Sequence, residues 1–297
     1  MAINRLQLVT IDGVQTDCAG LTVWWGLCKL IQCSRLSTAW QLAGLPMDVL
    51  PPPPSPTAVL CRTMNQLFQD RSTLVKPVSG KEGSYAVLPK GSDGSNNPEY
   101  TTSWTASIKK LPVTKPGVPP EEELVIDSRC PSKAADQLEI MFDSNMGTYG
   151  SIEQSQLMTN VVRWLRGARL HQGGKLYFLP PDKVADWRRV EATLKQSTRI
   201  ELFEIPALPA QSAMKAVLHA IKQEAEDAAI ELEEDVASSA GKATRPATLQ
   251  RRRDAAKEMR DKLTYYEGFL GQEMTALKDR LEAIELAKVK ADILEAF

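Results

Sequence analysis

Residues 166–181, RGARLHQGGKLYFLPP, combine a glycine pair with basic residues and an apolar run. A phosphate-binding loop needs glycines that lead into a helix, whereas Gly173-Gly174-Lys175 leads into LYFLP, which is typical of a strand. A glycine pair also suits a two-residue hairpin turn, because both positions accept positive φ. We therefore predict a β-hairpin here and no nucleotide site of the Walker type.

Amphipathic helices are predicted on both sides of this hairpin. Apolar residues recur at helical spacing within residues 151–167 and again within residues 182–196. The stretch that follows, RIELFEIPAL at residues 199–208, is typical of a strand. These elements predict a small helix–hairpin–helix–strand module over residues 151–208.

The same module carries an excess of basic residues. Between residues 160 and 199 there are nine basic and three acidic residues, in a chain whose net charge is −1. Such a surface could contact a phosphate backbone, but a solvated face or a face docked on an acidic partner has the same composition. The candidate nucleic-acid-binding residues are Arg163, Arg166, Arg169, Lys175, Tyr177, Arg188, Arg189 and Lys195.

Residues 1–145 are expected to form a β-rich domain. Two helices, over residues 36–43 and 56–69, are predicted to pack on an antiparallel sheet, and Ser55 followed by proline is a typical start for the second. Short apolar or β-branched runs between turn residues are the predicted strands. They are residues 5–11, 21–31, 72–78, 83–89, 101–111, 122–128 and 138–144.

Residues 209–297 are predicted to form an antiparallel helical hairpin, or coiled coil, because apolar residues recur in heptads. Its first helix should be about 42 Å long and its second about 75 Å, so that about 30 Å of the second overhangs. The apolar stripe of the overhang must cover either the β-rich body or another chain. These candidate interface residues are Leu277, Leu281, Ile284, Ala291 and Leu294.

Two charged runs lie within this hairpin. Residues 224–235 hold seven acidic and no basic residues, whereas residues 242–262, with Arg251, Arg252 and Arg253, hold eight basic and three acidic ones. Each run opposes the dipole of its own helix, but an antiparallel hairpin places the two runs side by side. We therefore favour ion pairs between the two helices over a nucleic-acid patch on the arginines.

Composition argues against several other classes of protein. The five cysteines have no C-x-x-C spacing, the two histidines lie in different predicted elements, and no common catalytic motif occurs. We expect no catalytic residues, metal or cofactor, although a carboxylate site that includes Asp127, Asp136 or Asp143 stays open. Without a signal peptide or a membrane span, the chain is expected to be cytoplasmic.

Three stretches resemble a family of unknown function that occurs in bacteria, phages and other mobile elements. They are LTVWWGL, AGLPMDVLPPPPSPTAVLCRTM and LHQGGKLYFLPP, in similar order and spacing over most of the chain. Thr57 and Leu60 depart from the acidic and aromatic residues expected in the second stretch. The resemblance implies a phage or mobile-element accessory protein and no particular activity.

We thus predict an α+β fold with three parts: a β-rich domain, a small basic α/β module and a C-terminal helical hairpin. The expected function is that of a non-enzymatic interaction or assembly protein, which self-associates or binds a partner through its C-terminal helices. The alternative is nucleic-acid binding through the basic residues between 160 and 199. An enzyme with a carboxylate site is the third hypothesis.

Overall fold

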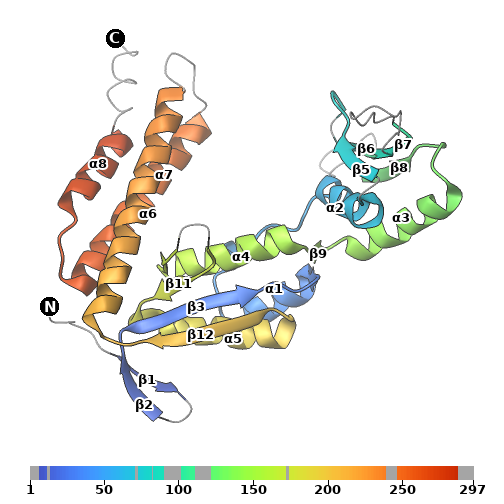
Figure 1. The fold of residues 1–297 in the computed structure, drawn as a ribbon. Helices are drawn as coiled ribbons and strands as arrows, with labels where there is room; N and C mark the ends of the chain where they lie inside the picture. Colours follow the sequence, from blue (N-terminus) through green and yellow to red (C-terminus); the bar gives the residue numbers. More distant parts are fainter. Residues whose placement is uncertain are drawn as a thin grey trace, which may run out of the picture. The chain divides into compact units, whose positions relative to one another are not determined.

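In the computed structural model the chain forms two compact units, and it combines helices with antiparallel sheets (Figure 1). Unit 1 comprises Met1–Cys28, Thr38–Leu50 and Ser155–Phe297, and unit 2 comprises Lys29–Ser37 and Pro51–Gln154. The α+β prediction is confirmed. The structure describes residues 7–11, 14–70, 73–81, 83–89, 102–110, 122–171, 174–238 and 246–286.

The central sheet of unit 1 joins segments that the sequence analysis had placed in different domains. Its strand order is β10 (Ala168–Arg169), β11 (Tyr177–Leu179), β3 (Gly20–Gly26) and β12 (Glu201–Ala207), all antiparallel. A central position suits β3, because its alternating residues Leu21 and Val23 can be fully buried on one face of the sheet. Residues 1–145 therefore do not form one domain, since β3 belongs with the basic module.

The predicted hairpin is present, but its turn differs from the predicted one. Arg169 pairs with Tyr177, and the Leu170 backbone N–H donates to the Leu176 carbonyl at 2.9 Å. This register leaves five residues, 171–175, between the strands, so the turn is not the glycine pair alone. Two of the five, residues 172 and 173, lie outside the described part of the chain.

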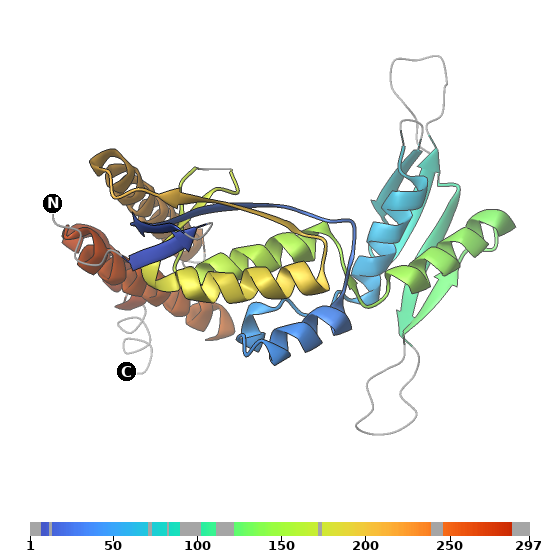
Figure 2. The same ribbon diagram turned by 90° about the horizontal axis from the view of Figure 1, so that it is seen from below.

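Helices cover one face of this sheet along most of its length. Figure 2 shows α4 (Ser151–Trp164) and α5 (Val184–Ser197) along the same side of β3 and β12. Leu21 and Val23 of β3 are fully buried, and the Trp187 indole N–H on α5 donates to the Glu204 carboxylate of β12 at 3.1 Å. Unit 1 also contains the pair β1 (Gln7–Ile11) and β2 (Val14–Cys18), and the short helices η1 (Met47–Val49) and η2 (Pro181–Lys183).

The described residues of the C-terminal region form three helices, so the prediction of one second helix of about 50 residues is wrong. After α6 (Gln211–Ser238), α7 (Pro246–Leu270) ends at Gly271, whose φ of +64° suits glycine and turns the chain. The next helix, α8 (Thr275–Leu286), folds back against α6 and α7. What the heptad pattern shows as a stutter at residues 270–274 is therefore a turn.

The predicted overhang consequently does not exist in the described part of the chain. Leu281 is only 1% exposed, and Leu277 and Ile284 pack on the same core. This core joins α6, α7 and α8 to Ala19, Ala168 and Phe178 at one end of the central sheet. The apolar stripe therefore covers the chain's own helices, and Ala291 and Leu294 lie outside the described residues.

The described part of unit 2 contains a four-stranded antiparallel sheet and the helices α2 (Pro56–Phe68) and α3 (Ser132–Asn145). Ser55 caps α2 as predicted, accepting the Ala58 backbone N–H at 3.3 Å. The strand predicted at residues 138–144 is wrong: Leu138 and Phe142 lie four residues apart and face the core from α3. The sheet strands are β5 (Thr73–Pro77), β6 (Ser84–Pro89), β7 (Trp104–Lys110) and β8 (Glu122–Ile126).

Three further elements complete the described part of the chain. The short strands β4 (Ile31–Gln32) and β9 (Thr148–Tyr149) pair within unit 2, and α1 (Cys33–Leu42) follows β4 directly. Among the described helices, none has a stretch that is both long and apolar enough to cross a bilayer.

Candidate functional site

Half of the predicted nucleic-acid-binding residues are engaged in ion pairs. The three basic residues on α5 all have acidic neighbours: Arg188 pairs with Glu191 and Glu204, Arg189 with Asp186, and Lys195 with Glu191. Burial alone would raise the pKa of Glu191, but hydrogen bonds from Lys195 and Arg188 outweigh it and lower that pKa. On α4, Arg163 lies 3.3 Å from Glu258. These side chains do not form a free basic surface.

The remaining basic candidates carry no ion pair among the described residues. The Arg166 guanidinium lies over the ring of Tyr265, 4.8 Å from its centroid, and Arg169 lies over Tyr177 at 5.8 Å. Tyr177 itself is buried and stacks on Trp25, with 5.3 Å between ring centroids. The predicted set thus splits into paired residues on the helices and a smaller group beside the hairpin.

The acidic and basic runs of the C-terminal helices face each other, as predicted. The Arg252 guanidinium lies 2.5 Å from Asp235, and the Lys262 ammonium lies 2.6 Å from Glu224. A hydrogen bond from Arg252 is the main reason why the pKa of Asp235 is lowered. A groove of about 890 Å³ beside these pairs is lined by five acidic and five basic side chains, which gives it no excess of charge for a polyanion.

The face of the sheet opposite α4 and α5 is open toward the Trp24 end. Trp24 pairs with Phe203 across the strands, and their rings stack at 5.4 Å. Phe203 is 41% exposed and Ile205, two residues further along the same face of β12, is 55% exposed. We call Trp24, Phe203 and Ile205 the sheet-face patch. The core of α6, α7 and α8 covers the other end of the sheet at Phe178.

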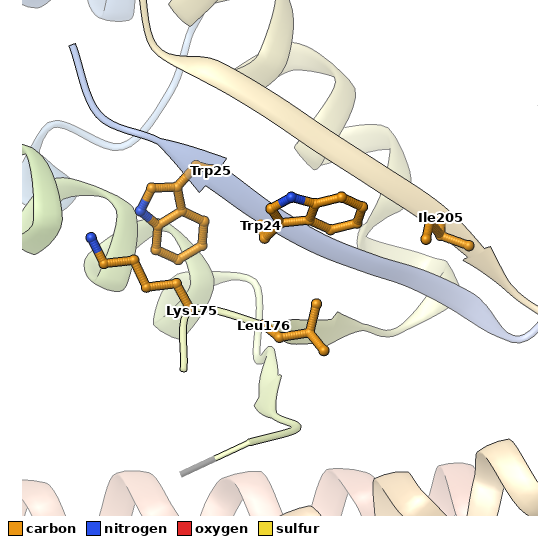
Figure 3. Close-up of a pocket in the computed structure, with 5 residues that line it drawn as sticks. All are labelled: Trp24, Trp25, Lys175, Leu176 and Ile205. Atoms are coloured by element: carbon orange, nitrogen blue, oxygen red, sulfur yellow. The ribbon is translucent and has the colours of Figure 1, made fainter. Parts of the chain in front are cut away.

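A pocket of about 380 Å³ adjoins this patch. It is lined by Trp24, Trp25, Lys175, Leu176 and Ile205 (Figure 3). Trp25 is only 6% exposed, yet its indole Nε1–H has no hydrogen-bond acceptor in the described structure. In Figure 3 this nitrogen and the Lys175 ammonium lie on the same side of the pocket. The pocket therefore combines two hydrogen-bond donors with apolar walls.

Sequence reasoning identified Lys175 of this pocket and missed the two tryptophans. The tandem Trp24-Trp25 could have indicated Trp24, because alternation along a strand places one of two adjacent rings on each face of the sheet. Nothing in the sequence places Trp25 beside the same pocket. The unsatisfied indole N–H has no sequence signal, since it depends on what the folded chain leaves beside it.

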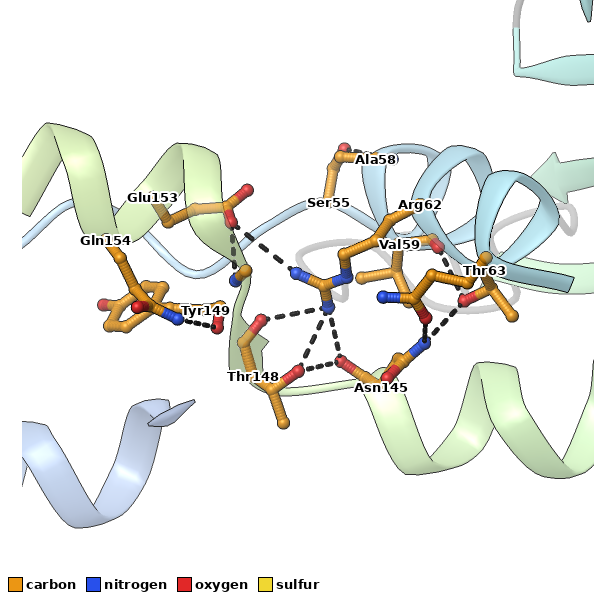
Figure 4. Close-up of polar contacts among 12 residues, drawn as sticks. Ser55, Ala58, Val59, Arg62, Thr63, Asn145, Thr148, Tyr149, Glu153 and Gln154 are labelled. Carbon is orange, nitrogen blue, oxygen red and sulfur yellow. Dashed lines mark hydrogen bonds and ion pairs between the residues drawn. The ribbon is translucent and has the colours of Figure 1, made fainter. Parts of the chain in front are cut away.

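A second polar cluster lies in unit 2, around Arg62 (Figure 4). Its guanidinium donates to the backbone carbonyls of Asn145 at 2.9 Å and Thr148 at 3.1 Å, and it lies 3.5 Å from Glu153. A Cβ on Gly150 would come within 2.6 Å of Arg62. These bonds fasten α2 to the segment between α3 and α4, so we assign the cluster a structural role.

The carboxylates considered for catalysis do not converge. Hydrogen bonds from Arg129 lower the pKa of Asp127 to about 2, which leaves it a poor proton carrier near neutral pH. Asp136 and Asp143 lie exposed on α3. Within the described ranges, no group of three or more His, Cys, Asp or Glu side chains is arranged to hold a metal ion.

Comparison with known proteins identifies a family but no activity. The model of a family of unknown function (DUF6744) matches residues 20–291, which confirms the predicted kind of family. No curated protein and no solved structure matches the chain.

Proposed function

We propose that the chain, which belongs to the DUF6744 family, is a non-enzymatic interaction protein that binds a partner polypeptide through the sheet-face patch. The observation that carries this proposal is the open face at Trp24, Phe203 and Ile205, where a stacked aromatic pair and an exposed aliphatic side chain adjoin a pocket. Exposed aromatic and aliphatic groups around a pocket are typical anchors of protein interfaces.

The distribution of charge favours a polypeptide over nucleic acid as the partner. A nucleic-acid surface needs several unpaired basic side chains along a phosphate backbone. Here the basic residues of α5 are paired with Glu191, Glu204 and Asp186, and among the five pocket-lining residues only Lys175 is charged. A mainly apolar patch with one cation suits a peptide better than a phosphate backbone.

The fold-back of α8 also changes where we expect the interface with a partner. Leu281 is buried against α6 and α7, so it is not available to another chain while α8 stays in place. The sheet-face patch has no such cover among the described residues. We therefore transfer the proposed partner contact from the C-terminal helices to β3 and β12.

Selection from a displayed library of random peptides, with the full chain as bait, tests the proposal. Peptides enriched on the intact chain are expected to share an apolar or aromatic residue and to be lost from Ile205→Ser. The matched control is Ile140→Ser, because Ile140 is 72% exposed on α3, in the other unit. Peptides that bind both variants equally well, or no enrichment on the intact chain, would contradict the proposal.

Nucleic-acid binding is the second candidate, favoured by the stacked arginines Arg166 and Arg169. A stacked guanidinium keeps its N–H edge free for a phosphate. If this candidate is right, affinity for single-stranded DNA falls steeply with salt, and Arg166→Gln with Arg169→Gln flattens that dependence by about two phosphate contacts. Unchanged salt dependence in the double variant would exclude this surface.

A further inference from the structure

We infer that the pocket beside the sheet-face patch takes a carboxylate with an adjoining apolar group, and that Trp25 Nε1–H and Lys175 Nζ bind its oxygens. This inference rests on the proposed function, because the carboxylate would be the polar anchor of the partner peptide. Its chemical source is either a peptide C-terminus or an acidic side chain.

The first support is the unsatisfied donor. An indole N–H donates and cannot accept, and buried polar groups nearly always have a partner. Trp25 is held in place by stacking on Tyr177, and nothing in the described structure accepts its proton. The nitrogen is itself buried, so a ligand oxygen would satisfy this hydrogen bond by entering from the adjoining pocket to the edge of the Trp25 ring.

The second support is Lys175, whose positive charge indicates that the missing acceptor is an anion. Lys175 is exposed, lines the same pocket and makes no ion pair among the described residues. An ammonium also has donors only, and its positive charge favours an acceptor that is an anion. An anionic oxygen answers both donors, and a hydrogen bond to a charged group is stronger than one between neutral groups.

The third support is the rest of the pocket wall. Trp24, Leu176 and Ile205 provide an aromatic ring and two aliphatic side chains next to the donors. A volume of about 380 Å³ is at the small end of ligand pockets and suits one side chain with its carboxylate. Free phosphate or a sugar phosphate would leave these apolar walls without a partner.

One group of the protein itself could compete for the indole N–H. Glu201 shares the open face with Phe203 and pairs with Gly26, the residue after Trp25. Its carboxylate does not accept from Trp25 in the structure. The variant Glu201→Ala separates the two explanations, because it removes both carboxylate oxygens and adds no hydrogen-bond donor.

The indole N–H resonances of the full, 15N-labelled chain provide the test, with Trp25→Phe to assign the signal. We expect N-acetyl-phenylalanine to shift the Trp25 resonance at millimolar concentration and N-acetyl-phenylalaninamide, which lacks the carboxylate, to leave it unchanged. Lys175→Met should weaken the effect of the acid about tenfold, whereas Lys215→Met, at an exposed lysine of α6, should not. A capped dipeptide, N-acetyl-leucyl-glutamate α-amide, compares a side-chain carboxylate with the C-terminal one.

The outcomes separate this inference from the proposed function. Equal shifts with the acid and the amide would overturn the carboxylate and leave an apolar docking pocket. The inference would be overturned if no probe shifts the Trp25 resonance. It would also be overturned if Glu201→Ala shifts that resonance and N-acetyl-phenylalanine then causes no further shift. Peptide selection that still depends on Ile205 would then keep the proposed function, whereas its loss would end both.

Discussion

Arg166 occupies a backbone position that normally selects glycine, and replacing it tests the geometry beside the hairpin. Its φ is +56°, and it is the only non-glycine residue with positive φ among the described residues. The Arg166 N–H donates to Arg163 and the Gly167 N–H to Val162, a bonding pattern that ends α4 with a left-handed residue. We predict that Arg166→Gly is more stable than Arg166→Ala.

The magnitude follows from two opposing contributions. A side chain in the left-handed region costs about 1 kcal/mol, which glycine avoids and alanine does not. Both variants lose the contact of the guanidinium with Tyr265, worth about 0.5–1 kcal/mol at an exposed site. Arg166→Ala should therefore lose about 0.5–1 kcal/mol of unfolding free energy, while Arg166→Gly stays within about 0.5 kcal/mol of the parent chain.

Urea unfolding of the full chain measures this difference. A gap of about 1 kcal/mol between the variants moves the unfolding midpoint by about 0.5 M. The control pair is Lys257→Gly and Lys257→Ala, at an exposed site inside α7, where glycine should be the less stable by about 1 kcal/mol. If alanine is as stable as glycine at Arg166, the left-handed geometry and the reasoning built on it are wrong.

Three further predictions concern the packing and charge of unit 1. Leu281→Ala should lower the free energy of unfolding by about 3 kcal/mol, because Leu281 is buried. Leu42→Ala, at an 83% exposed site, should change it by less than about 0.5 kcal/mol. Similar losses in the two variants would contradict the fold-back of α8. Gly167→Ala should cost about 1–3 kcal/mol in the same urea assay, since its Cβ would lie 2.4 Å from Val162; no loss would contradict that packing. Arg252 lowers the pKa of Asp235, so this ion pair stabilises the fold above the ordinary aspartate pKa, and the stabilisation is lost as pH falls below about 4. Asp235→Asn should therefore make the urea midpoint depend less on acid pH. An unchanged dependence would refute the pairing.

Local pattern predicted most elements but not how distant segments combine. The strands at residues 73–77, 84–89 and 104–110 and the cap at Ser55 follow from alternation and capping. The pairing of β3 with β11 and β12 joins residues more than 150 positions apart, and no local signal specifies that register. The predicted domain division fails for this reason.

The candidate site shows the same limit. Lys175 was predicted as a basic residue of the hairpin, but its neighbour Trp25 comes from β3, which sequence reasoning placed in another domain. The C-terminal stripe was predicted correctly as apolar, yet the turn at Gly271 decides which residues pack against it. One glycine within a helical pattern is compatible with either a continuous helix or a turn.

The affinity of a selected peptide for the full chain and for Phe203→Ser tests the central claim most directly. Loss of the ring removes the stack on Trp24, so fluorescence polarisation should show at least about tenfold weaker binding, with Ile140→Ser unchanged. Circular dichroism should show that Phe203→Ser remains folded, because Phe203 is 41% exposed. Binding to the folded variant within about twofold of the intact chain would contradict the claim that the sheet-face patch is the docking surface.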